Sequence, residues 1–178
     1  FNFFIFICFF ITVYEWQTMT KKKPYNLAGN IFLIFSFYSV YFVRNNLEEE
    51  SLFFFLFIIL ICMSTDIGGY VFGKTFKGPK LIKISPKKTY AGALGGLILS
   101  LVAALIYSKY TSTGADTYGN LSTWTSIPLN KVYFLFILVI SFVSQIGDLI
   151  ISYFKRLAKV KDTGSLLPGH GGLLDRID

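Results

Sequence analysis

Charged residues are scarce in this sequence. They make up 15% of the 178 residues, against about a quarter in a typical soluble domain. Cysteine is rarer still: Cys8 and Cys62 lie in separate apolar runs, and no C-x-x-C or Cys/His ligand spacing occurs, which argues against a zinc site or a disulfide framework. Strict apolar–polar alternation is also missing, which argues against strands. What the sequence has instead is 53% apolar residues and a mean hydropathy of +0.57.

The apolar residues gather in five segments, approximately 1–14, 27–43, 51–72, 91–108 and 129–153. A helix that crosses a membrane needs about 20 residues, so the first segment is expected to be a span cut short. The sequence therefore predicts an all-α, polytopic membrane bundle of about five spans, in a single domain over residues 1–178. Phe1 begins inside an apolar run and Asp178 ends a polar motif, so we expect a fragment that lacks both termini.

The segments between the apolar runs alternate between basic and non-basic. The segments 15–26, 44–50, 73–90, 109–128 and 154–178 hold 3, 1, 6, 1 and 5 lysines and arginines in that order. Cytoplasmic loops carry an excess of these residues, so the first, third and fifth segments are expected to face the cytoplasm. The net charge of +7 suits a membrane surface or a phosphate-bearing substrate better than nucleic acid, given the apolar runs.

Two carboxylates, Asp66 and Asp148, lie inside predicted spans. A carboxylate there costs several kcal/mol unless it is paired or hydrated, so it indicates a functional site. Asp66 lies seven residues before Gly73 and Asp148 seven before Lys155, so both are about 10 Å below the membrane edge, which predicts one shared polar cavity. Ser144, Ser152 and Lys155 share a helix face with Asp148. The alternative is a carboxylate that only packs helices, bonded to Ser, Thr or Tyr.

Glycines form two further patterns. Gly92 and Gly96 make a G-x-x-x-G, which predicts close helix packing. Residues 68–75 match the P-loop pattern G-x-x-x-x-G-K-[ST], which is meaningful only between a strand and a helix. An apolar span precedes this stretch and Pro79 follows it closely, so we predict that it is no P-loop.

The segment 73–90 places two hydroxyls and two ammonium groups within five residues. These groups, which suit phosphate binding, belong to Ser85, Lys87, Lys88 and Thr89. A basic cytoplasmic loop that binds anionic lipid headgroups is the alternative.

The richest chemistry lies in residues 152–178. A proline and three glycines surround the only histidine, His170, and predict a loop whose backbone N–H groups can approach a phosphate. In this setting His170 could donate to phosphate or act as an acid–base group. Asp175, Arg176 and Asp178 follow, and carboxylates beside basic donors fit a Mg²⁺–phosphate site. The alternative is a solvated charged turn.

This stretch resembles the signature of the phosphatidate cytidylyltransferase (CDP-diacylglycerol synthase) family. The signature reads S, K-R, K-D, P-x-H-G-G and D-R-x-D at fixed spacing, and the matching positions are Ser152, Lys155, Arg156, Lys161, Asp162, Pro168, His170, Gly171, Gly172, Asp175, Arg176 and Asp178. Residues 66–96 resemble the family's D-x-x-A/G-Y-x-x-G-K…S-P-K-K-T-x-x-G…G-G stretch, 144–148 its S-Q-x-G-D, and Glu15-Trp16 its W/Y-E-W. Ala91 and Ile151 depart from the pattern, where the family has an acidic or amide residue and a glutamate.

The resemblance implies a transferase that makes CDP-diacylglycerol and pyrophosphate from CTP and phosphatidic acid, with its signature in 144–178. It implies a divalent cation, Mg²⁺ or another, held by Asp148 and Asp175. The expected catalytic residues are Asp148, Lys155, Arg156, Lys161, Asp162, His170, Asp175, Arg176 and Asp178. The expected substrate-binding residues are Asp66, Ser85, Lys87, Lys88, Thr89, Ser144 and Ser152. A homodimer in a lipid bilayer, the bacterial inner membrane, with its site facing the cytoplasm, is also expected.

Three other functions compete with this one. An ion-coupled transporter would also place Asp66 and Asp148 in the membrane, but would not need the Gly/His/Asp/Arg loop. A lipid-binding structural protein would explain the lysines but not the two acids. A kinase that uses CTP on a lipid hydroxyl is the nearest chemical rival, and its product would differ.

Overall fold

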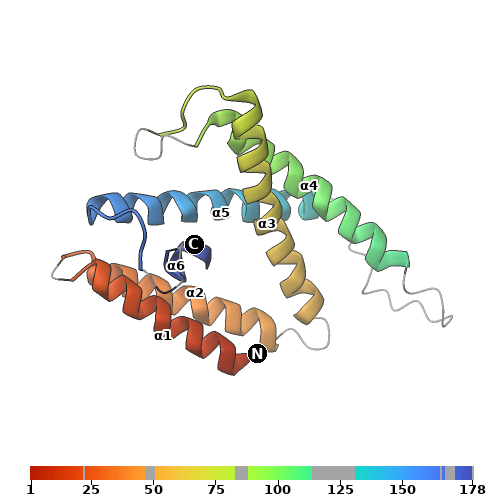
Figure 1. Cartoon of the computed structure of the whole chain (residues 1–178). Coiled ribbons are helices and arrows are strands. Elements are labelled where there is room, and N and C mark those ends of the chain that lie inside the picture. Colours follow the sequence, from red (N-terminus) through yellow and green to blue (C-terminus); the bar gives the residue numbers. More distant parts are fainter. Residues whose placement is uncertain are drawn as a thin grey trace. The chain divides into compact units, whose positions relative to one another are not determined.

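The computed structural model describes residues 1–21, 23–46, 51–82, 88–113, 131–164, 166 and 171–177 (Figure 1). The helices in this part are α1 (Asn2–Met19), α2 (Asn26–Asn46), α3 (Ser51–Phe76), α4 (Tyr90–Thr113), α5 (Lys131–Leu157) and α6 (Leu174–Ile177). These residues include no strand, and an isolated bridge joins Lys80 to Thr89. Helices α1 to α5 are each long and apolar enough to cross a membrane, which confirms the predicted all-α polytopic architecture.

The chain divides into two compact units. Unit 1 comprises Phe1–Ser51 and Ile150–Asp178, and unit 2 comprises Leu52–Leu149. The single domain inferred from the sequence stays a prediction.

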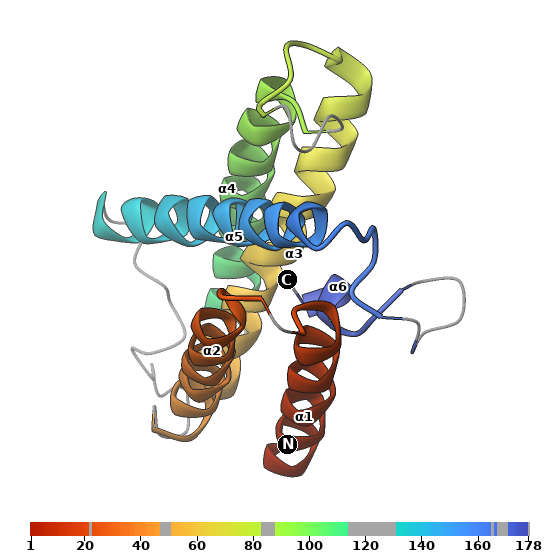
Figure 2. The same cartoon turned by 90° about the vertical axis from the view of Figure 1, so that its left-hand side faces the viewer.

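In unit 1, helices α1 and α2 form an antiparallel hairpin and lie side by side in both views (Figures 1 and 2). Trp16 is buried at their turn, where its indole N–H donates to the Asn26 carbonyl at 3.0 Å. The indole ring lies directly on Gly29, where a Cβ would fall 1.9 Å from it, so only glycine allows this approach. Leu33 and Leu174 complete the buried cluster around Trp16.

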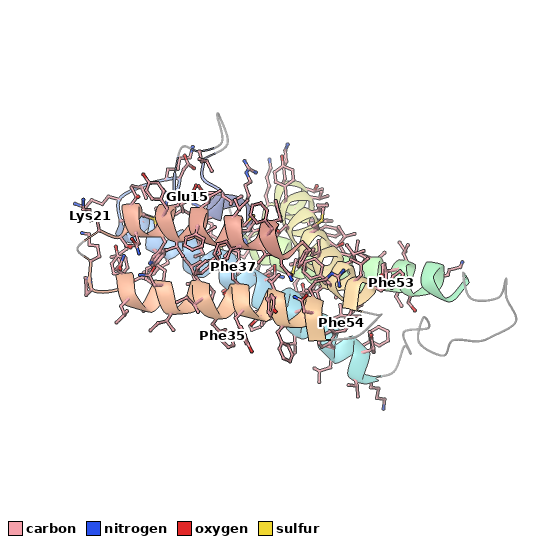
Figure 3. All side chains as sticks on the ribbon, turned by 90° about the horizontal axis from the view of Figure 1, so that it is seen from below. Glu15, Lys21, Phe35, Phe37, Phe53 and Phe54 are labelled. Atoms are coloured by element: carbon pink, nitrogen blue, oxygen red, sulfur yellow. The ribbon has the colours of Figure 1, made fainter. Side chains whose placement is uncertain are left out.

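The hairpin also shows how the apolar residues divide between packing and the surrounding medium. Phe37 lies between α1 and α2, where its ring meets that of Phe9 at 5.4 Å, whereas Phe35 points away from α1 (Figure 3). Phe35 is 68% exposed and Phe3 is 77% exposed. Large apolar side chains directed outward along these helices suit a surface in contact with lipid acyl chains.

In unit 2, helices α3 and α4 pack through glycines. A Cβ on Gly92 would lie 2.6 Å from the Gly69 carbonyl oxygen, and one on Gly96 would lie 2.8 Å from the Thr65 carbonyl oxygen. The packing predicted for the G-x-x-x-G is therefore confirmed. Residues 68–75 lie within α3, so the stretch that matches the P-loop pattern is helical. The prediction that it is no P-loop is therefore confirmed.

The core of unit 2 joins α5 to these two helices. Phe57, Ile61, Ala104 and Ile137 form its buried apolar cluster. A buried pair of hydroxyls, Thr65 on α3 and Ser141 on α5, lies 2.7 Å apart. Because Thr65 also donates to the Ile61 carbonyl at 2.8 Å, Ser141 is left to donate to Thr65, and both hydroxyls are satisfied away from water.

Candidate functional site

Unit 2 contains a cavity of about 280 Å³ that is lined by the two membrane carboxylates, Asp66 on α3 and Asp148 on α5. The two acids therefore line one cavity, as their matched depth predicts. The remaining lining comes from α3, α4, α5 and the segment before α4: Thr65, Gly69, Tyr70, Leu81, Lys88, Thr89, Gly92, Ala93, Gln145 and Leu149. Three small residues, Gly69, Gly92 and Ala93, leave room for the cavity, and the charged side chains form part of its wall.

Lys88 forms an ion pair with Asp148 inside this cavity. The side chains are only 25% and 38% exposed, so solvent screens the pair less than it would at a surface. The backbone before α4 fixes Lys88: its carbonyl accepts from the Leu81 N–H at 2.8 Å, and the Tyr90 N–H donates to the Pro79 carbonyl at 3.1 Å.

Thr89 has a structural role beside the cavity. Its hydroxyl oxygen accepts from the Gly92 N–H at 3.1 Å and so caps the N-terminus of α4. The hydroxyl proton stays free to donate, so the capping bond is compatible with the predicted contact to substrate.

Gln145 is a cavity residue that did not stand out from the sequence as a site residue. Its amide nitrogen donates to the Ala93 carbonyl at 3.2 Å and links α5 to α4 at the cavity wall. The only signal was its place in the S-Q-x-G-D stretch. Ser144, predicted to bind substrate, is half-buried on α5 and is not among the lining residues.

Unit 1 holds the other acid of interest, Asp175, in α6. Its Oδ1 accepts from the Lys155 ammonium at 2.8 Å. Its Oδ2 accepts from the Thr163 N–H at 2.7 Å, the Thr163 hydroxyl at 3.0 Å and the Gly172 N–H at 2.9 Å. Burial raises the pKa of Asp175, but these bonds outweigh it and hold the pKa below its ordinary value of 3.8.

Gly171 lets the chain close around Asp175. Its φ is +86°, and a Cβ there would lie 2.8 Å from Asp175 Oδ2 and 3.2 Å from Asp162 Cβ. Both the backbone conformation and the lack of space require glycine at this position. The glycines of the signature thus serve a compact turn around a carboxylate.

The remaining predicted site residues divide into exposed and half-buried groups. Ser152 is half-buried on α5, and the Arg156 guanidinium donates to the Val160 carbonyl at 3.4 Å. The exposed predicted residues are Arg156, Lys161, Asp162 and Arg176. Ser85, Lys87, His170 and Asp178 lie outside the described residues.

A divalent cation fits the chemistry of these carboxylates. Both proposed ligands already hold a cationic group, Lys88 on Asp148 and Lys155 on Asp175. Among the described residues no three His, Cys, Asp or Glu side chains gather, so a cation would need substrate oxygens to complete its shell, as Mg²⁺ commonly does. The metal site shared by Asp148 and Asp175 stays a prediction, because the two residues belong to different units.

The chain is similar to known proteins over most of its length. The model of the cytidylyltransferase family matches residues 1–178. A phosphatidate cytidylyltransferase of Rickettsia conorii is 35% identical over 92% of this chain and 68% of the relative. Those of Staphylococcus saprophyticus and Brucella suis are 39% and 34% identical, over 74% and 96% of this chain and 46% and 57% of the relatives. With the family model matched from end to end, the chain belongs to the cytidylyltransferase family.

Proposed function

We propose that this chain transfers a cytidylyl group from CTP to phosphatidic acid, giving CDP-diacylglycerol and pyrophosphate in phospholipid biosynthesis. The observation that carries the proposal is the cavity lined by Asp66, Asp148 and Lys88, whose two acids lie on helices that can cross a membrane. Charged groups of both signs at the wall of such a cavity suit a polyphosphate whose reaction partner is a lipid. The family and the names of the relatives agree with this chemistry.

The reaction needs alignment more than it needs a protein nucleophile. An oxygen of the phosphatidate phosphate attacks the α-phosphorus of CTP, the bond to the β-phosphate oxygen breaks, and pyrophosphate leaves. The attacking phosphate monoester is ionised near neutral pH, since its second pKa is about 6, so little general-base help is required. The protein must hold two anions together and reduce their repulsion.

The residues of the chain divide this work. Lys88, with Lys87, Lys155 and Arg156, would hold the triphosphate, and Ser85 and Thr89 would donate hydroxyl hydrogen bonds to it. Asp148 and Asp175 would hold Mg²⁺, or another divalent cation, which when bound supplies positive charge to the reacting phosphates. Lys88 can move from Asp148 to a phosphate oxygen. The cation would then replace Lys88 as the positive partner of the Asp148 carboxylate.

The setting of the site completes the proposal. The alternation of basic segments supports a site that faces the cytoplasm, where CTP is found, in a bacterial inner membrane. The resemblance supports a homodimer, which crosslinking of the purified protein in lipid nanodiscs would detect.

Product analysis tests the proposed reaction. The full chain in nanodiscs, given labelled CTP and phosphatidate with Mg²⁺, should yield CDP-diacylglycerol and pyrophosphate. A lipid kinase would instead release CDP, and a transporter or a lipid-binding protein would consume no CTP. Asp148→Asn should abolish turnover without loss of folding, whereas Ser36→Ala on α2, which removes a hydroxyl bonded to the Phe32 carbonyl of the same helix, should leave it unchanged. Full turnover of Asp148→Asn would contradict the assignment of the cavity.

A further inference from the structure

Glu15 is a buried acid near the C-terminal end of the apolar helix α1. It is 4% exposed and points to the chain around α6 (Figure 3). Among the described residues, no lysine or arginine lies within 4.0 Å of its carboxylate. A buried carboxylate without a cationic partner is costly, so its hydrogen bonds must account for its presence.

Those hydrogen bonds come from the backbone of the C-terminal segment, residues 158–177. Glu15 Oε1 accepts from the Leu173 N–H at 2.8 Å, and Oε2 accepts from the Leu174 N–H at 2.9 Å. The Thr163 hydroxyl lies 3.3 Å from Oε2. Hydrogen bonds to a charged acceptor are about twice as strong as neutral ones, so Glu15 fixes two separate stretches of the segment.

Two glycines give the carboxylate its space. A Cβ on Gly164 would lie 2.9 Å from Glu15 Oε1, and one on Gly172 would lie 2.5 Å from Oε2. Both distances are shorter than real Cβ contacts. The C-terminal segment therefore contacts the Glu15 side chain at two places, Gly164 and Gly172. In the sequence, these lie on either side of His170, a predicted site residue.

Thr163 connects Glu15 to Asp175. Its hydroxyl lies 3.0 Å from Asp175 Oδ2 and 3.3 Å from Glu15 Oε2, while its N–H donates to Asp175 at 2.7 Å. A shift of Glu15 would therefore be transmitted through one residue to Asp175 and to its partner Lys155.

We propose that Glu15 is a positioning residue for cytidylyl transfer: it anchors the C-terminal segment to α1 and so sets the place of Asp175 and Lys155. The inference rests on the proposed function for the reaction, but the anchoring itself rests only on unit 1. Glu15 touches no reacting atom in this account. Its effect is on the geometry of charged groups, and a displacement of about 1 Å there can cost on the order of 10²-fold in rate.

The first experiment replaces Glu15 by glutamine in the full chain in nanodiscs. The amide keeps the shape but presents N–H to backbone N–H donors, so one of the two bonds to Leu173 and Leu174 is lost. We expect kcat per folded enzyme to fall by roughly 10–10²-fold, and KM for CTP to rise as well, because Lys155 is one of the groups proposed to hold the triphosphate. Hydrogen exchange at Leu173 and Leu174 should rise, while that of α2 stays unchanged.

Two variants bracket this result. Glu15→Asp keeps the charge but is one methylene shorter, so kcat should lie between the wild type and Glu15→Gln. Thr18→Val is the matched control, since among the described residues the Thr18 hydroxyl bonds within α1, to the Tyr14 carbonyl, and its loss should change neither kcat nor exchange. If Glu15→Gln keeps the wild-type kcat and exchange, the inference is wrong. A purely structural role of Glu15 predicts a uniform rise in hydrogen exchange with unchanged kcat per folded enzyme. That result would also overturn the inference.

A double-mutant cycle tests the anchoring without activity. A Cβ on Gly164 would meet Oε1, Cδ and Cγ of Glu15 at 2.9, 3.1 and 3.2 Å, so Gly164→Ala should raise exchange at Leu173 in the wild type. In a Glu15→Ala background the same substitution should add nothing, and additive effects would refute the contact. If the wild type makes no CDP-diacylglycerol, the proposed function fails and the catalytic part of this inference with it, while the cycle still decides the anchoring.

Discussion

Replacing Gly68 and Gly69 of α3 by alanine, one at a time, applies the same chemical change to two neighbouring positions with opposite surroundings. A Cβ on Gly68 would lie 2.6 Å from the Gly95 carbonyl oxygen, and 2.9 Å from both Gly96 Cα and Leu99 Cβ. On Gly69 it would meet only the Gly92 carbonyl oxygen, at 3.9 Å, an ordinary contact. The first change therefore forces α3 and α4 apart, and the second fits.

The size of the effect follows from two terms. Glycine to alanine inside a helix stabilises by about 0.5–1 kcal/mol, and this term is common to both variants. Overpacking at Gly68 costs about 1–3 kcal/mol, because two of the three atoms it meets are backbone and cannot rotate away. Since the shared term cancels, the free energies of unfolding of the two variants should differ by about 1–3 kcal/mol, with Gly69→Ala the more stable.

Reversible unfolding in mixed micelles, followed by circular dichroism, measures this difference. Gly147→Ala on α5 is a second control: nothing lies within 4 Å of its Cβ position, so it should behave like Gly69→Ala. If Gly68→Ala is as stable as Gly69→Ala, the glycine contact between α3 and α4 is not as close as described, and the reasoning fails.

Three further predictions use the charged groups. Lys88→Ala should raise KM for CTP by about tenfold or more, whereas Lys131→Ala at the far end of α5 should not; an unchanged KM would favour a lipid-surface role for this segment. Because the pKa of Asp175 is lowered in the folded chain, the stability it contributes is fully present above its ordinary value of 3.8 and is lost as the pH falls through the folded pKa. Trp16 fluorescence in a Trp124→Phe background should report this release through Leu174, and Asp175→Asn should remove the pH dependence. Single cysteines at Lys21 and Lys161, in a chain without Cys8 and Cys62, should resist an impermeant reagent outside intact cells, and one at Lys109 should react; reaction at Lys21 would reverse the predicted orientation.

The membrane spans could be predicted because long apolar runs have few alternatives. The end of the first span was placed too early, at residue 14, whereas α1 runs to Met19. Glu15 looked like the end of the apolar run, because a carboxylate is expected outside a span. It stays in the helix because backbone N–H groups some 160 residues later in the chain bind it.

The cavity acids could be predicted from their depth, but their partners could not. The pairing of Lys88 with Asp148 depends on the turn before α4, which brings together residues 60 positions apart. For Asp175, two of the four donors are backbone N–H groups, and every residue except proline carries one, so the sequence gives no direct signal for them. The indirect signal was the set of glycines at 164, 171 and 172, which leave room for two carboxylates.

The contact of Glu15 with Leu173 and Leu174 has a consequence for biosynthesis. Unit 1 is built from both ends of the chain, so residues 52–149 must be synthesised between its two parts. At about 5–20 residues per second, α1 waits on the order of 10 s in the membrane before the donors for its carboxylate exist. During that time the Glu15 carboxylate needs another hydrogen-bond partner, such as water or an insertion factor. A nascent chain that stops before residue 173 keeps this unsatisfied acid, which would make incomplete chains recognisable to membrane quality control.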